Sequence, residues 1–365
     1  MIKKSCLALF LLVSVTVGAF AAEWTVKDDV NTVEDARVTP PGRKVDVLLD
    51  GKLVARFVYG EGQIKPFLNV FSDEGDCLTQ WDPKQDLPHH RGIYIGWNKI
   101  SSDLGGPVKA PAKPKKGEAA PAPTPAPAAG TIDPKGTFDL WHMNNGGKME
   151  VVKIEKAEGG ADSGTIVATI AWHAGNKDAS GSDLLLTETR TMKISRPEAK
   201  KTVVDLKFDL KAARDLTLGG DLQHAGMHFR GSEEILKSKI QNDKAKKGAI
   251  TADYETAYVW EPTDKIKGDD LKWARLMFHI GTHWYSATHM NAPSNPVEEL
   301  SMRGYGRFGF FFKKDLKKDE VLPLTYRIVT ESEKNLKAIP TAEEKTAEKT
   351  DGAALYDDFA KSVAK

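Results

Sequence analysis

The segment VVDLKFDL at residues 203–210 decides the fold class. Its apolar residues occupy every second position from Val204 to Leu210, and Asp or Lys fills the positions between them. Successive side chains of a β-strand point to opposite faces, so this pattern is typical of a strand with one buried face. We therefore predict a strand here that packs against an apolar core.

Strand-like segments continue on both sides of this one. Val45–Leu49 and Leu53–Tyr59 flank Asp50-Gly51, a pair that favours a type I′ hairpin turn. Other candidates are Thr165–Trp172, Leu184–Ile194, Ala225–Arg230, Leu276–Ile280, Arg307–Phe312 and Leu322–Thr330. Many short strands separated by turn residues predict an all-β fold, a large antiparallel β-sandwich, as a single domain over residues 23–332.

Two segments depart from the strand pattern. Residues 105–130 are rich in Pro, Ala and Lys, which predicts a disordered or polyproline-like insertion inside the domain. Residues 333–349 are rich in Glu, Lys, Ala and Thr and predict a charged linker or polar helix. Leu355, Phe359 and Val363 then recur at a spacing of four, which predicts a short C-terminal amphipathic helix over 353–363.

The first 22 residues have the features of a cleaved export signal. Lys3 and Lys4 precede an apolar run from Leu7 to Val17, and small residues at 18–22 supply a cleavage context. The apolar run is shorter than the ~20 residues of a membrane-spanning helix. We expect a periplasmic or secreted protein with no transmembrane segment after signal cleavage.

Charge and cysteine content exclude several classes of protein. The 52 Lys and Arg balance 51 Asp and Glu, and loss of the two leader lysines leaves 50 against 51. A balanced charge is unlike that of a polybasic nucleic-acid binder, so no nucleic-acid partner is expected. Cys6 lies in the leader, which leaves Cys77 alone and excludes sites built from four thiolates. The sequence leaves the cofactor unknown.

The densest polar cluster is WDPKQDLPHHRG at residues 81–92. His89 and His90 point opposite ways if the chain is extended there, so one can face a cleft while the other packs. Histidine offers acid, base or metal-ligand chemistry near neutral pH, and Arg91 can clamp a carboxylate or bind hydroxyls. The alternative is a hydrogen-bonded loop with structural histidines.

A second cluster, DLQHAGMHFR, spans residues 221–230. As a strand it places Ala225, Met227 and Phe229 on one face, and His224, Gly226, His228 and Arg230 on the other. The glycine leaves a gap through which a ligand could approach the backbone. At ~3.3 Å per residue the two histidines are about 13 Å apart, too far to share one metal. An exposed polar sheet face is the alternative.

The remaining candidates lie in two other segments. His289, Asn295, Arg303 and Tyr305 belong to a polar region rich in Asn, Pro and Gly that could contact sugar hydroxyls. Glu188 and Arg190 share a strand face with apolar residues, either as a buried ion pair or as the floor of a site in which Glu188 is an acid or base.

Three elements of the sequence resemble the exported bacterial PmoA family, also called DUF6807. They are Leu87-Pro88-His89-His90-Arg91-Gly92, Phe138-Asp139-Leu140-Trp141, and Asn295-Pro296 with Arg303–Gly309. The match runs from about residue 40 to 332. The long 105–130 insertion and the Leu140-Trp141-His142 segment depart from the family pattern, in which a Phe-Trp pair is usual. The resemblance implies a sandwich of the galactose-mutarotase-like supersandwich kind, without an established activity.

The resemblance does not imply methane oxidation. The monooxygenase subunit that lent the family its name is built from transmembrane helices, and none is expected here. A carbohydrate-related role follows only by analogy of architecture.

These observations lead us to expect a carbohydrate-active protein, an enzyme acting on a glycan or sugar derivative by acid–base chemistry as a hydrolase, lyase or epimerase. A non-catalytic carbohydrate- or ligand-binding sandwich is the first alternative. The second is a metalloenzyme that uses His89 or His90 with His224 or His289. The expected acid–base residues are His89, His90, His224, His228 and Glu188. The expected substrate contacts are Arg91, Trp97, Asp139, Trp141, Asp221, Arg230, His289, Asn295, Arg303 and Tyr305.

Overall fold

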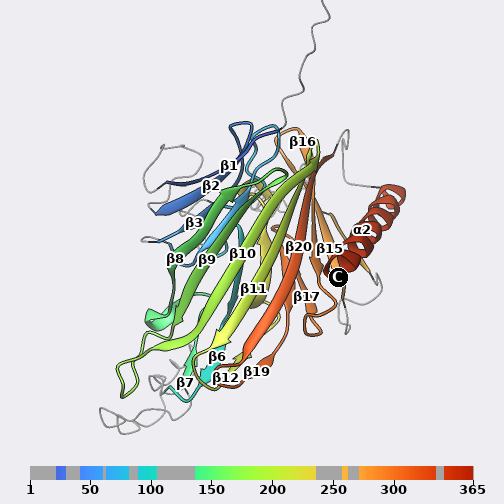
Figure 1. Cartoon of the computed structure of the whole chain (residues 1–365). Helices are drawn as coiled ribbons and strands as arrows, with labels where there is room; N and C mark the ends of the chain where they lie inside the picture. The colour runs from blue at the N-terminus through green and yellow to red at the C-terminus, as the bar shows by residue number, and fades with distance from the viewer. Residues whose placement is uncertain are drawn as a thin grey trace, which may run out of the picture.

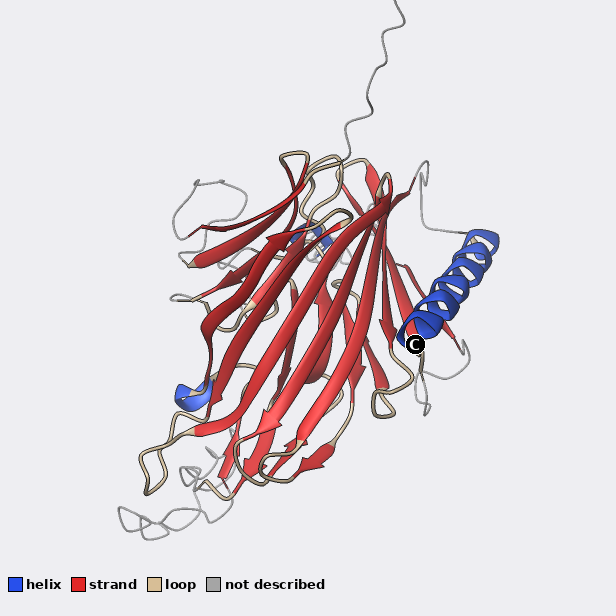
Figure 2. Ribbon diagram, in the orientation of Figure 1, coloured by secondary structure: helices blue, strands red, loops and turns tan. Residues whose placement is uncertain are grey.

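The computed structural model describes residues 22–29, 42–60, 63–81, 89–104, 136–235, 257–261, 271–333 and 341–364. The predicted leader, up to residue 21, and the predicted insertion at 105–130 lie outside these ranges. Figures 1 and 2 show an all-β fold in which long strands make up most of the described chain and one long helix lies at the side. The all-β sandwich that the sequence predicts is confirmed.

Two eight-stranded sheets and one small sheet contain the described strands. In spatial order, the first sheet consists of β1 (Trp24–Asp29), β2 (Arg43–Leu49), β3 (Lys52–Tyr59), β4 (Phe67–Val70), β5 (Ile93–Trp97), β13 (Ala225–Arg230), β18 (Arg307–Phe311) and β17 (Glu299–Arg303). The second consists of β14 (Ala257–Glu261), β15 (Trp273–Ile280), β16 (His283–Asn291), β20 (Val321–Glu333), β11 (Lys201–Ala212), β10 (Leu184–Glu198), β9 (Ser163–His173) and β8 (Lys148–Gly159). The small sheet consists of β19 (Lys314–Leu316), β12 (Leu216–Gly219), β6 (Lys99–Ser102) and β7 (Gly136–Phe138).

The predicted hairpin joins β2 to β3. Asp50 and Gly51 have φ values of 50° and 76°, the positive values that a type I′ turn requires at both central positions. Leu49 and Lys52 pair directly across the turn. The hairpin is therefore confirmed.

The hydrophobic core lies between the two large sheets. Phe57, Ile95 and Phe308 of the first sheet belong to the same buried cluster as Ile170, Leu206 and Tyr326 of the second. The alternation in β11 follows the prediction, since Val204, Leu206, Phe208 and Leu210 are buried and the residues between them are more exposed. Burial of these apolar faces drives the two sheets together.

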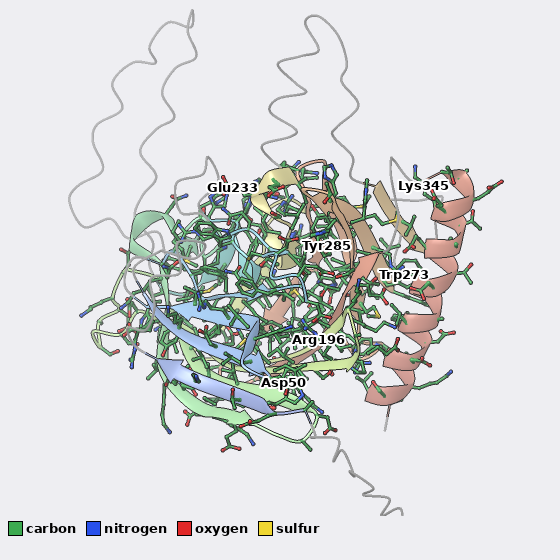
Figure 3. The ribbon with its side chains drawn as sticks, turned by 90° about the horizontal axis from the view of Figure 1, so that it is seen from above. Asp50, Arg196, Glu233, Trp273, Tyr285 and Lys345 are labelled. Atoms are coloured by element: carbon green, nitrogen blue, oxygen red, sulfur yellow. The ribbon has the colours of Figure 1, made fainter. Side chains whose placement is uncertain are left out.

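Helix α2 (Ala342–Val363) packs on the outer face of the second sheet. It begins earlier than predicted because Thr341 forms a capping box with Glu344. Its buried residues are Gly352, Tyr356 and Phe359, and Leu355 is partly buried against the same cluster. The predicted apolar face is therefore confirmed at Leu355 and Phe359 but not at Val363, which is 38% exposed. Figure 3 shows Trp273 beside the helix, and a buried Arg275 donates to Glu348 and Asp351 of the helix.

Candidate functional site

The candidate site lies on the face of the first sheet that turns away from the core. Along β13, Ala225, Met227 and Phe229 belong to the core cluster, so the alternation of a strand places His228 and Arg230 on the opposite face. On β5, Ile93, Ile95 and Trp97 face the core, whereas Tyr94 packs in a separate cluster with Val58, Phe67 and Trp141. The predicted two-faced strand at 225–230 is confirmed.

Two turns with the same local sequence dock at the end of β5. They read Asp139-Leu140-Trp141-His142 and Asp221-Leu222-Gln223-His224, and we call them the Asp-Leu-x-His turns. Leu140 N–H donates to Trp97 O, and Asn98 N–H donates to His224 O. The first turn can approach β5 because Gly96 has no side chain; a Cβ there would lie 2.4 Å from the Leu140 carbonyl oxygen.

Each turn orients its histidine through its aspartate. Oδ1 of Asp139 accepts from Trp141 N–H and Oδ1 of Asp221 accepts from Gln223 N–H, at 3.0 Å in both cases. The Nδ1 atoms of His142 and His224 lie 2.8 Å from these same carboxylates. A carboxylate only accepts, so each Nδ1 carries the proton, which leaves Nε2 as an acceptor in the neutral ring.

Both aspartates are ionised at neutral pH. Burial opposes the ionisation of Asp139, but hydrogen bonds from His142 and from backbone N–H groups lower its pKa overall. Burial likewise opposes ionisation of Asp221, and hydrogen bonds from Asn98 and the Gln223 N–H lower its pKa overall. The negative charges hold the two imidazoles in one tautomer.

Five histidines form a continuous group around the turns, which we call the histidine cluster: His89, His90, His142, His224 and His228. Ring centroids are 4.1 Å apart for His89 and His90, 4.6 Å for His89 and His142, and 5.0 Å for His142 and His224. The side chains of His142 and His224 are 28% and 34% exposed, whereas His90 and His228 are buried. The cluster therefore runs from the surface to the sheet.

Trp141 connects the buried members of the cluster. Its indole N–H donates to Nε2 of His90 over 3.2 Å, and its ring lies 4.9 Å from that of His228. The ammonium of Lys65 donates to the Trp141 carbonyl oxygen over 2.7 Å and lies over the rings of Tyr94 and Trp141, at 4.4 and 4.6 Å from their centroids. Hydrogen bonds thus hold Trp141 both at its indole ring and at its backbone carbonyl.

The buried histidines are neutral. Nε2 of His228 donates to Ala225 O over 2.9 Å, and its Nδ1 accepts from Arg307 over 3.2 Å. Burial, followed by the charge of Arg307, holds the pKa of His228 well below its usual range. Burial also lowers the pKa of His90 well below its usual range and that of His89 to about 3. These rings therefore do not carry charge at neutral pH.

Several predicted residues meet at this site. They are His89, His90, Arg91, Asp139, Trp141, Asp221, His224, His228, Arg230 and Tyr305. Arg91 donates to Gln63 over 2.7 Å. The Arg230 guanidinium lies 4.9 Å from the centroid of the Tyr305 ring, which in turn stacks 6.3 Å from the His90 ring. The predicted polar clusters at residues 81–92 and 221–230 therefore converge. Tyr305, from the third polar region, lies beside both of them.

Other predicted residues lie elsewhere, and their expected place in the site is corrected. His289 is buried in the core against Phe310 and Tyr326, with ring centroids 4.7 and 5.5 Å away. Trp97 is a core residue whose indole donates to Phe312 O. Asn295 closes a turn by exchanging hydrogen bonds with Thr325, and Arg303 ends β17, where it donates to Met302 O. None of these positions is on the histidine cluster.

Glu188 is also a core residue. It accepts from Arg190 over 2.5 Å and from the Trp172 indole over 2.8 Å, so it forms the buried ion pair that the sequence offered as one interpretation. Arg190 also donates to the carbonyl oxygen of Pro66, next to Lys65. The pair therefore supports the loop beneath the site and is not its floor.

The predicted ligand gap at Gly226 is filled by protein. A Cβ at this position would lie 1.8 Å from the carbonyl oxygen of Phe310 on the neighbouring strand, and the glycine φ is +95°. Glycine is required there for the close approach of β18 to β13.

Sequence reasoning missed four residues of the site: Lys65, Tyr94, His142 and Arg307. The repeated Asp-Leu-x-His sequence was a signal that could have identified His142, because its counterpart His224 was already a candidate. The others are isolated residues in a loop or a strand, without a local pattern.

Neither a metal centre nor a membrane span is found in the described part of the chain. Within it, no group of three or more His, Cys, Asp or Glu side chains is arranged to hold a metal ion. No helix there is long and apolar enough to cross a bilayer.

Comparison with known proteins gives a family without an activity. No curated protein matches the sequence. Residues 44–342, which make up most of the chain, match a family described as a family of unknown function, DUF6807. The protein therefore belongs to the DUF6807 family.

Proposed function

We propose that this protein is an exported carbohydrate-active enzyme that transfers protons to and from a carbon atom of a sugar derivative, as a lyase or an epimerase. The observation that carries the proposal is the pair of Asp-Leu-x-His turns. They hold the His142 and His224 rings 5.0 Å apart, each with Nδ1 on an aspartate and with no Nε2 partner among the described residues. Two imidazoles oriented in this way are suited to act as base and acid.

The carboxylates of the cluster favour this chemistry over glycoside hydrolysis. A glycosidase uses one carboxylic acid of raised pKa to protonate the leaving oxygen and a second carboxylate as nucleophile or base. Asp139 and Asp221 have lowered pKa values, and each is already engaged by a histidine and by backbone N–H groups. The proton-transfer groups of the site are therefore imidazoles.

The proton balance of an elimination fits two such groups. The neutral imidazole takes the proton from carbon, and the C–H electron pair forms the new C=C bond as the adjacent C–O bond breaks. The second imidazole, in its protonated form, gives its proton to the departing oxygen. In an epimerisation the proton returns to the opposite face of the same carbon. In both reactions, nearby cations such as Arg307 stabilise the negative charge that develops on the substrate.

Exported location is part of the proposal and rests on residues 1–22. N-terminal sequencing of the mature protein should begin near Ala22 or Glu23. Recovery of a chain that retains Met1 from the cell envelope would contradict export with cleavage.

The reaction is tested by incubating the protein in deuterated water with a panel of neutral and acidic oligosaccharides. Mass spectrometry detects both an unsaturated product and deuterium incorporated at carbon. We expect one of these products with the native sequence and with His173→Ala, but not with His224→Ala. His173 is a matched control because it makes the same 2.8 Å contact with an aspartate, Asp183, and does not belong to the histidine cluster. Binding of an oligosaccharide with neither product would instead indicate a non-catalytic sandwich.

A further inference from the structure

Two basic side chains, Lys65 and Arg307, lie at the buried end of the site, and the Asp139 carboxylate attracts Lys65 without a direct ion pair. Lys65 is 4% exposed and Arg307 is 1% exposed, and neither forms an ion pair within the described ranges. Both lie over aromatic rings, with the Arg307 guanidinium 5.9 Å from the Trp141 centroid. Burial of an unpaired charge costs free energy, so this end of the site favours a compensating anion.

Hydrogen-bond donors without acceptors surround the rings of Tyr94 and Trp141. Nε2 of His90 accepts from Trp141, so Nδ1 of the neutral ring carries the proton, and this N–H is buried without a hydrogen-bond partner. The Tyr94 hydroxyl and Arg307 Nε are also buried without an acceptor, since Arg307, which acts on the hydroxyl, can only donate. Burial raises the pKa of Tyr94, so the phenol keeps its proton. A bound group that accepts hydrogen bonds would satisfy these three donors.

We propose that the Tyr94–Trp141 end of the site receives the carboxylate of an acidic sugar, so that the substrate is a uronate or a uronate-containing glycan. The inference rests on the proposed function and names its substrate class. Arg307 supplies a permanent positive charge here, whereas burial holds the pKa of Lys65 well below its usual range. A carboxylate would compensate the charge of Arg307.

The placement also suits the proton transfer. In a uronate, the carbon next to the carboxylate carries the proton that an elimination or an epimerisation must remove. Neutralising the carboxylate by Arg307 and by the three donors lowers the barrier to removing that proton, since negative charge moves toward the carboxylate. The partly exposed His142 and His224 would then lie on the side from which the rest of the sugar enters.

The test is calorimetric titration of the full mature chain with glucuronate, galacturonate, glucuronamide, glucose and sulfated glucose. Glucuronamide is the matched ligand because it has the shape of glucuronate without its charge. We expect at least one uronate to bind about tenfold more tightly than its uncharged counterpart, the effect of a charge-assisted hydrogen bond. Equal binding of uronate and glucuronamide, binding of sulfated glucose alone, or no binding of either uronate would overturn the inference.

Two variants locate the effect. Lys65→Met keeps the length of the side chain and removes its amine, and Arg307→Lys keeps the charge and removes the guanidinium. Both should weaken uronate binding several-fold, while Lys272→Met should not, since Lys272 lies over the Tyr356 ring of α2, away from the site. If either site variant fails to fold, the comparison of ligands on the unaltered protein still decides the inference.

The outcomes separate this inference from the proposed function. Tight uronate binding without any deuterium incorporation or unsaturated product supports the carboxylate site and contradicts the enzyme. Turnover of neutral glycans without a preference for uronates supports the enzyme and contradicts the carboxylate site.

Discussion

Trp141 donates its indole N–H to Nε2 of His90 over 3.2 Å, at the centre of a cluster of five histidines. Because an indole can only donate, this one contact fixes the proton of the neutral His90 ring on Nδ1. Burial keeps the ring neutral, with a pKa well below its usual range. This buried histidine beside the turns is therefore a hydrogen-bond donor toward the site at neutral pH.

This relationship predicts the protonation state of His90 in solution. Imidazole nitrogen NMR should show the Nδ1–H tautomer, and the ring should remain neutral at about pH 5, below the usual pKa of histidine. In Trp141→Phe, a variant that keeps the aromatic packing, the preference for this tautomer should be lost. Titration of His90 near pH 6.5 in the native protein would contradict the account.

Glu298 gives a prediction about stability and pH. Burial raises the pKa of its carboxyl from 4.5 to about 8 in the folded protein, and it accepts a hydrogen bond from the Tyr326 hydroxyl over 2.9 Å. The unfolded chain loses this proton as pH rises above about 4.5, while the folded protein keeps it until about pH 8. The contribution to stability is therefore complete below pH 4.5 and is lost as pH rises to 8.

Glu298→Gln removes the group that titrates. We expect the variant to gain stability over the native protein between these pH values, by up to about 1.4 kcal/mol for each pH unit, and to differ little near pH 4. Urea unfolding at both ends of the range measures the difference. A constant difference at all pH values would show that Glu298 does not titrate as described.

The contact between Gly352 and Trp273 predicts an unusual effect of alanine. In an exposed helix interior, Gly→Ala stabilises by about 1 kcal/mol. Here a Cβ would lie 2.5 Å from the Trp273 ring. We expect Gly352→Ala to lower the melting temperature by pushing α2 away from the second sheet. An increase in melting temperature would mean that the helix does not pack as closely as we describe.

Strands such as β11 and β13 were predictable because alternation records which face of a strand is buried. The faces of β16 were harder to assign. His289 shares the core face with Tyr285 and Ala287, but the opposite face is also covered, because Met290 packs under α2. With both faces buried, the sequence offers no contrast that distinguishes a core histidine from a site histidine.

The site was only partly predictable for a related reason. His228 and Arg230 could be identified because they alternate with apolar residues on one strand. Lys65 is a single lysine in a loop, and it is buried only because that loop lies against Trp141, a residue distant in the sequence. Contacts of this kind depend on the packing of loops over the sheet, and no local pattern encodes them.

A double-mutant cycle on His142 and His224 tests the central claim most directly. On the oligosaccharide that the native protein converts, kcat should fall at least about a hundredfold in His142→Ala and in His224→Ala, the usual contribution of a general acid or base. The kcat of the double variant should be only slightly lower than that of the less active single variant, because base and acid act in one step. All three should unfold at nearly the native melting temperature, since both side chains are partly exposed. Native kcat in both single variants would contradict the claim that the paired Asp-Leu-x-His turns form the catalytic site.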